Sequence, residues 1–84
     1  MKHIIFNTAN TCARQIEFDI NDNKRIQNLK FYGGCNGNLK AIASLLEGED
    51  ALKTASKLKN NTCGTRNTSC CDQLSKAIME ALNE

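Results

Sequence analysis

The chain has 84 residues, a formal net charge of +2, and acidic and basic side chains interleaved along its length. A chain of this length forms one domain, and its core is small because short chains bury only part of their unfolded surface. The interleaved charges exclude the basic stripe typical of nucleic-acid binders, and no window approaches the ~18 apolar residues of a membrane span. We therefore expect neither nucleic acid nor a membrane among its partners.

The N-terminal segment MKHIIFNTAN carries one lysine and an apolar run of only three residues. This run is too short for the core of a signal peptide, and no small-residue cleavage site follows it. The sequence therefore predicts a cytoplasmic protein, in which thiols stay reduced and structural disulfides are disfavoured.

The first part of the chain has the two-residue alternation of β-strands. KHIIFN at residues 2–7 predicts a short first strand, and RQIEFDI at residues 14–20 predicts a longer second one. In the longer segment Ile16, Phe18 and Ile20 fall on one face and polar residues on the other, which is typical of a half-buried strand.

A third strand follows the turn signal NDN at residues 21–23. In its segment RIQNLKFYGG, Leu29 and Phe31 alternate, whereas Ile26 is out of phase with both of them. This offset predicts a bulge or a change of register within the strand. Together the three segments predict an antiparallel meander.

The rest of the chain changes to the period of α-helices. A first helix, ending at Gly48, is predicted from apolar residues spaced i, i+3, i+4 and i+7, which are Leu39, Ile42, Ala43 and Leu46. A second helix is predicted over residues 50–59, with Asp50 as its N-cap. The residues of this second helix that are expected to face inward are Leu52, Ala55 and Leu58.

A third helix is predicted from about Cys70 to Leu82. Ser69 and Asp72 have the spacing of a capping box at its start. Its apolar stripe consists of Leu74, Ala77, Ile78, Ala81 and Leu82.

Strands come first and helices follow, which predicts an α+β fold. We expect a three-stranded antiparallel meander followed by three helices packed on one face, in two layers. One domain is expected over residues 1–84, with the strands in 1–34 and the helices in 35–84.

Five cysteines are the unusual feature of so short a chain. Cys35 lies in GGCNGN, between the third strand and the first helix, where glycines allow a tight turn. Cys70 is expected in the first turn of the last helix, where the partial positive charge of the helix N-terminus favours an anion. Cys12 and Cys63 lie in polar loops before the second strand and before the last helix. If these loops gather at one end of the sheet, the four sulfur atoms converge.

Four converging thiols predict a metal site formed by Cys12, Cys35, Cys63 and Cys70. Four thiolates close a tetrahedral site, which favours zinc, with an iron–sulfur cluster as the alternative. A metal would also stabilise a small core, since the free energy of metal binding contributes to folding. The spacings contain no CxxC pair, however, and a free cysteine is often only a small buried apolar residue. Spacing alone leaves both interpretations open.

No complete active site is evident in the sequence. The single histidine, His3, lies beside Ile4 and Ile5 in the first strand, which is typical of an edge or surface residue and not of a metal ligand. There is no Ser-His-Asp set and no Walker or GxGxxG loop, and GGCNGN is not a phosphate-binding loop. Any chemistry of this chain therefore belongs to sulfur.

Two segments, GGCNGNLKAIASLLEG and TCGTRNTSCCDQLSKAI, together with a cysteine in the N-terminal loop, resemble the small four-cysteine TSCPD-domain family. The resemblance spans nearly the whole chain and implies that the family's cysteines correspond to Cys12, Cys35, Cys63 and Cys70. The proline of the family's motif is replaced here by Cys71. Proline suits the first turn of a helix, and its loss need not break the fold.

TSCPD domains are also found at the C-terminus of adenosylcobalamin-dependent ribonucleotide reductases. The resemblance therefore implies an accessory or regulatory role, with ribonucleotide reductase or another protein as the partner. The chain lacks the length of the radical barrel, so it is not such an enzyme by itself. The label ribonucleoside-diphosphate reductase, which stand-alone copies often carry, reflects this association.

A more distant similarity is to iron–sulfur scaffold proteins of the IscU/NifU type, which share the order of three strands and then helices. Cys12, Cys35 and Cys70 would be the counterparts of the scaffold cysteines. The chain lacks the proline-rich chaperone-recognition segment, and Ser69 stands where a histidine usually precedes the last cysteine. The similarity therefore implies the fold order, but not a working assembly scaffold.

Three functions remain open from the sequence. The leading one is a metal-binding module that uses the four cysteines. The second is a metal-free thiol–disulfide relay, in which Cys70 or Cys71 exchanges with a partner and Cys63 is the second sulfur of the pair. The third is an interaction module whose cysteines are merely buried. The sequence does not specify the oligomeric state.

Overall fold

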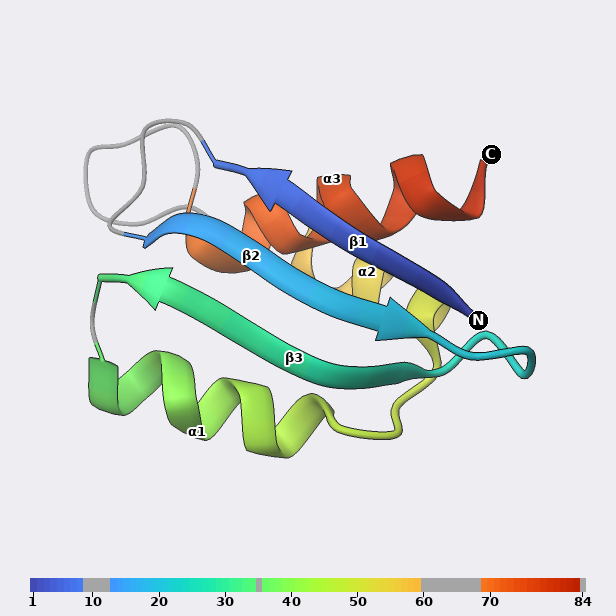
Figure 1. Ribbon diagram of the computed structural model, residues 1–84, viewed down its shortest axis with the longest axis horizontal. Helices are drawn as coiled ribbons and strands as arrows, with labels where there is room; N and C mark the ends of the chain where they lie inside the picture. The colour runs from blue at the N-terminus through green and yellow to red at the C-terminus, as the bar shows by residue number, and fades with distance from the viewer. Residues whose placement is uncertain (9–12, 35, 60–68, 84) are drawn as a thin grey trace.

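The computed structural model describes residues 1–8, 13–34, 36–59 and 69–83. Three strands come first and three helices follow, as the sequence predicts (Figure 1). The elements are β1 (Lys2–Asn7), β2 (Ala13–Ile20), β3 (Ile26–Gly33), α1 (Asn36–Leu46), α2 (Ala51–Leu58) and α3 (Cys70–Leu82). None of the helices in these ranges is long and apolar enough to cross a membrane.

The sheet is an antiparallel meander in the order β1-β2-β3. In the pairing of β1 with β2, His3 lies opposite Asp19. In the pairing of β2 with β3, Ala13 lies opposite Gly33. These two pairs lie toward opposite ends of β2. The pair of Ala13 and Gly33 lies in the segments that flank Cys12 and Cys35, and the pair of His3 and Asp19 belongs to a polar cluster on the sheet.

β3 contains the bulge that the out-of-phase Ile26 predicts. Its register against β2 shifts between Glu17 and Asp19. Asn28 lies at the shift with a φ of +57°, in the left-handed region that asparagine tolerates better than most residues. The bulge allows both Ile26 and Leu29 to face the core, where both are buried.

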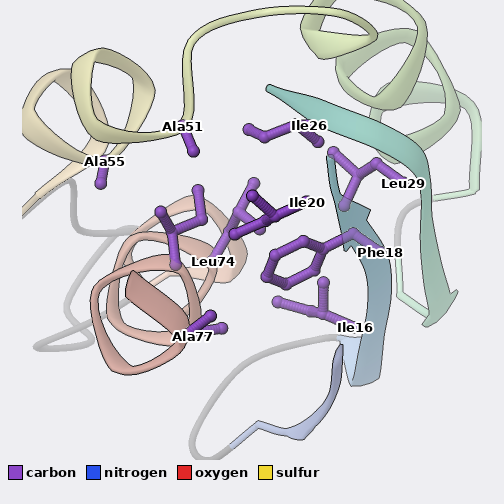
Figure 2. Packing of buried hydrophobic residues seen from close by; sticks show 11 residues of the cluster. Ile16, Phe18, Ile20, Ile26, Leu29, Ala51, Ala55, Leu74 and Ala77 are labelled. Carbon is purple, nitrogen blue, oxygen red and sulfur yellow. The ribbon is translucent and has the colours of Figure 1, made fainter. Parts of the chain in front are cut away.

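One apolar core lies between the sheet and helices α2 and α3 (Figure 2). Ile16, Phe18 and Ile20, the inward residues of β2 predicted by alternation, are all buried. They face Leu74 and Ala77 of α3 (Figure 2). α1 instead lies along β3 (Figure 1).

The inward face of α2 differs from the prediction. Of the predicted inward residues, Ala55 is buried and Leu58 packs partly buried against the core, but Leu52 is 53% exposed, and Ala51 and Thr54 are buried as well. The apolar spacing of this short helix fits two neighbouring faces, and close packing against α3 favours the face with small residues. The prediction for Leu52 was therefore wrong.

Asp50 precedes α2 as predicted, but its side chain makes no capping hydrogen bond. The main chain around it pairs with the start of β3 instead. Asp50 forms an isolated bridge with Arg25, and the N–H of Ile26 donates to the carbonyl of Glu49 at 2.9 Å. These tertiary backbone contacts hold the start of α2 where a side-chain cap was expected.

Candidate functional site

The described segments that flank Cys12, Cys35 and Cys70 lie at one end of the molecule. β2 begins, β3 ends, and α1 and α3 begin at this end, on the left of Figure 1. Cys12 directly precedes β2, and Cys35 directly precedes α1. Cys12, Cys35 and Cys63 lie outside the described residues. Of the four predicted ligands, the structure describes Cys70.

Cys70 is the first residue of α3, and it is half-buried. Oγ of the preceding Ser69 accepts a hydrogen bond from the N–H of Asp72 at 3.1 Å, so the predicted N-cap is confirmed. The cap sets the direction of the first helical turn. The partial positive charge of the helix N-terminus lies at Cys70.

A hydrogen bond links Cys70 to the start of β2. The main-chain N–H of Ala13 donates to Sγ of Cys70 with an N···S distance of 3.5 Å. A thiolate accepts such a bond more strongly than a thiol, because hydrogen bonds to ionised acceptors are stronger. Since Ala13 directly follows Cys12, the bond brings the main chain next to Cys12 against Cys70.

β3 brings a third segment to the same place. Ala13 lies opposite Gly33, which is two residues before Cys35. Gly33 and Gly34 have φ values of +84° and +80°, which residues with a Cβ rarely adopt. A Cβ at Gly33 would also lie 3.4 Å from Nε of Arg14. The predicted tight turn ahead of Cys35 is therefore present as far as Gly34.

Cys71 has a different environment from its neighbour Cys70. It is half-buried, and burial together with the nearby charge of Cys70 raises the pKa of its thiol. A raised pKa keeps a thiol protonated, and a protonated thiol is a poor nucleophile and a poor metal ligand. Of the two adjacent cysteines, Cys70 is the one whose Sγ accepts a hydrogen bond from the main-chain N–H of Ala13.

A second polar cluster lies on the outer face of the sheet. Nδ1 of His3 lies 2.6 Å from Oδ1 of Asp19, and Nε2 of His3 lies 2.8 Å from Oε2 of Glu17. Oη of Tyr32 donates to Oε1 of Glu17 at 2.5 Å. Nδ2 of Asn28 donates to Oδ2 of Asp19 at 3.0 Å. The cluster therefore connects all three strands.

The hydrogen bonds of this outer cluster favour a protonated His3 and ionised Glu17 and Asp19. The hydrogen bond with Asp19 raises the pKa of His3, because an imidazolium donates from both of its ring nitrogens. The hydrogen bond from Tyr32 lowers the pKa of Glu17, and the one from Asn28 lowers the pKa of Asp19.

His3 lies at the surface, as the sequence predicts, but its partners were missed. Strand alternation places Glu17 and Asp19 on one face of β2. Only the register of β1, which sets His3 opposite Asp19, shows that the histidine meets them.

Within the described ranges, no group of three or more His, Cys, Asp and Glu side chains is arranged to hold a metal ion. The metal site expected from Cys12, Cys35, Cys63 and Cys70 includes three residues outside these ranges. That ligand set therefore stays a prediction.

Comparison with models of protein families matches the TSCPD domain over residues 2–82. No curated protein and no solved structure gives a significant match. The matched range contains all three strands, all three helices and the five cysteines. The chain therefore belongs to the TSCPD-domain family.

Proposed function

We propose that the chain is a metal-binding module in which Cys12, Cys35, Cys63 and Cys70 hold one zinc ion. The observation that carries the proposal is the hydrogen bond from the N–H of Ala13 to Sγ of Cys70, at 3.5 Å. This bond joins the start of β2, next to Cys12, to the start of α3.

Chain geometry supports a shared position for these cysteines. Consecutive Cα atoms are about 3.8 Å apart, so Cys12 stays next to Ala13. Gly33 is the cross-strand neighbour of Ala13, and two more residues along the chain lead to Cys35. Cys63 is seven positions before the start of α3, a length of chain that spans well over 10 Å when extended.

The chemistry of the donor set supports zinc. Four thiolates fill a tetrahedral site and leave no open position, which is typical of structural zinc. Bound zinc would cross-link the loops of a domain whose core is small. The N–H that reaches Cys70 is the kind of outer contact that supports a metal-bound thiolate. An iron–sulfur cluster is the alternative occupant of the same four sulfurs.

Elemental analysis and native mass spectrometry of anaerobically purified protein test the proposal. We expect about one zinc per chain, or iron with sulfide if the cluster is bound. Serine substitution of Cys12, Cys35, Cys63 or Cys70 is expected to abolish metal retention. Cys71→Ser is the matched control, because it removes the adjacent thiol and is expected to keep the metal. A metal-free folded protein, or loss of metal in Cys71→Ser alone, would contradict the proposal.

A thiol–disulfide relay is the second candidate, and the half-buried neighbours Cys70 and Cys71 favour it over an interaction module with fully buried cysteines. If the purified protein is metal-free, oxidant should form a reversible Cys63–Cys70 or Cys63–Cys71 disulfide. Peptide mapping after alkylation identifies the pair. A thiol count unchanged by oxidant excludes the relay.

Ribonucleotide reductase is the partner that we propose to test first, since TSCPD domains also occur as a part of that enzyme. We expect stoichiometric addition of the metal-loaded chain to change the activity of a reductase or its response to effectors. If a saturating concentration of the chain changed neither property, ribonucleotide reductase would be excluded as the partner, and the proposed metal site would not be affected by that result.

A further inference from the structure

A groove opens between α2, α3 and β1, and side chains from all three elements line it. Its volume of about 570 Å³ lies within the usual range of small-molecule pockets, about 300–1,000 Å³. We propose that this groove binds a small amphipathic anion, a molecule with an apolar body and one acidic headgroup. This inference does not depend on the proposed metal centre.

Part of the groove's lining is apolar. Phe6 of β1 is half-buried, Ala55 of α2 is buried, and Met79 of α3 is 39% exposed. The thioether chain of Met79 is flexible and polarisable, so it adapts to the shape of a bound body. Covering these side chains removes apolar surface from water, which favours an aromatic or aliphatic ligand.

The walls of the groove are held in place by the contact between the two helices. Oγ of Ser75 donates to the carbonyl of Ala55 at 2.8 Å, and both groups are buried. On the α3 side, Asp72 is buried and its Oδ2 lies 3.6 Å from Nζ of Lys76. These contacts are made between groups of the protein itself, so they hold the groove's walls in place and lower the cost of ordering them on binding.

The rim contributed by α2 attracts an acidic headgroup. Ser56 and Lys59 lie three residues apart and both line the groove, so a hydroxyl and an ammonium face the same space. Lys59 is the C-cap of α2, whereas the two lysines within α2, Lys53 and Lys57, line a different hollow. The ion pairs found among the described residues do not include Lys59.

The rim contributed by α3 is mixed in charge. Lys76 is partly neutralised by Asp72, and Glu80 also lines the groove. The charge available to a ligand therefore lies on the α2 side, at Lys59. An anionic headgroup is expected there, with the apolar body over Met79.

Two probes with the same apolar body test the proposal on the folded full-length protein. 1-Anilinonaphthalene-8-sulfonate carries a sulfonate, and N-phenyl-1-naphthylamine is its neutral analogue. In fluorescence titrations we expect the sulfonate to bind about fivefold more tightly, the effect of one partly exposed charge pair. Amide NMR signals around Phe6, Ala55 and Met79 are expected to shift.

Lys59→Glu is expected to remove the preference for the sulfonate probe. Lys53→Glu is the matched control, since it makes the same charge change on the same helix but lies outside this groove. The control is expected to keep the preference. Equal binding of both probes to the unaltered protein, equal losses in both variants, or NMR shifts confined to the outer face of the sheet would overturn the proposal.

Discussion

The main-chain N–H of Ala13 donates a hydrogen bond to Sγ of Cys70, across a sequence separation of 57 residues. The bond ties the first residue of β2 to the first residue of α3. Ala13 also pairs with Gly33 at the end of β3, so three segments that flank cysteines meet at one point. The metal site proposed at this point uses the thiol of Cys70 as a ligand but not the thiol of its neighbour Cys71. Substitutions of the two residues are therefore expected to have different effects.

Cys70→Ser is expected to lower the melting temperature of the metal-loaded protein and to abolish its response to a chelator. The physical reason is that a metal bound only to the folded state adds its binding free energy to stability. Cys71→Ser is expected to keep the full response. Thermal unfolding followed by circular dichroism, with and without EDTA, measures both variants. Equal chelator responses in the two variants would show that Cys70 is not a ligand.

Ser69→Ala is expected to reduce the free energy of unfolding by about 1 kcal/mol. The substitution removes the Oγ that accepts the N–H of Asp72 at the buried start of α3. Ser44→Ala is the control, because Ser44 is an exposed residue in α1 and its loss is expected to stay within about 0.5 kcal/mol. Urea denaturation measures both. A cost for Ser69→Ala no larger than the control would mean that the cap is not stabilising.

The outer cluster is expected to make stability depend on pH through His3. The hydrogen bond with Asp19 raises its pKa in the folded state above the ordinary value of 6.5, so the folded protein binds the proton more tightly. The stabilisation is therefore complete below about pH 6.5 and is lost as the pH rises through the raised value. His3→Gln is expected to flatten this decline in melting temperature.

Two measurements distinguish the contribution of His3 to the pH dependence of stability from the contributions of its neighbours. Since His3 is the single histidine of the chain, NMR titration of its ring reports the folded pKa directly. Tyr32→Phe removes the hydrogen bond to Glu17 but leaves both ion pairs of His3, so the decline above pH 6.5 should persist. The lowered pKa values of Glu17 and Asp19 act in a separate, acidic window, where stability is lost as the pH falls. A folded pKa of His3 at or below 6.5 would refute the prediction.

Two substitutions at Asn28 are expected to separate the backbone of the bulge from its side chain. Asn28→Gly keeps the left-handed conformation at φ +57° and loses the hydrogen bond to Asp19. Asn28→Ala loses that bond and also strains the backbone, so it should cost about 1 kcal/mol more. Urea denaturation of the two variants measures the difference. Equal costs would mean that the side chain alone accounts for the choice of asparagine.

Periodicity was sufficient to predict the order and type of the elements. Alternation placed Ile16, Phe18 and Ile20 inside, and the offset of Ile26 predicted the bulge, because burial of one strand face is a local consequence of residue order. The cap at Ser69 was also predictable, since its partner Asp72 is only three residues away.

Local patterns failed where packing between elements chose among alternatives. Leu52 and Ala55 share an inward stripe of α2 by spacing, yet only Ala55 of the two is buried, and Ala51 and Thr54 take the place expected for Leu52. Asp50 occupies the predicted N-cap position, yet its side chain makes no capping hydrogen bond and its backbone pairs with Arg25.

The sequence by itself determined the strands, the helices and the small core, because each follows from residue types at short spacing, and the resemblance of its motifs indicated the family. Only the tertiary structure decided that Ala13 meets Cys70, that His3 lies between Glu17 and Asp19, and that α2, α3 and β1 together line a groove. These relationships depend on strand register and helix rotation. Both are set by how whole surfaces pack, and no local spacing contains that information.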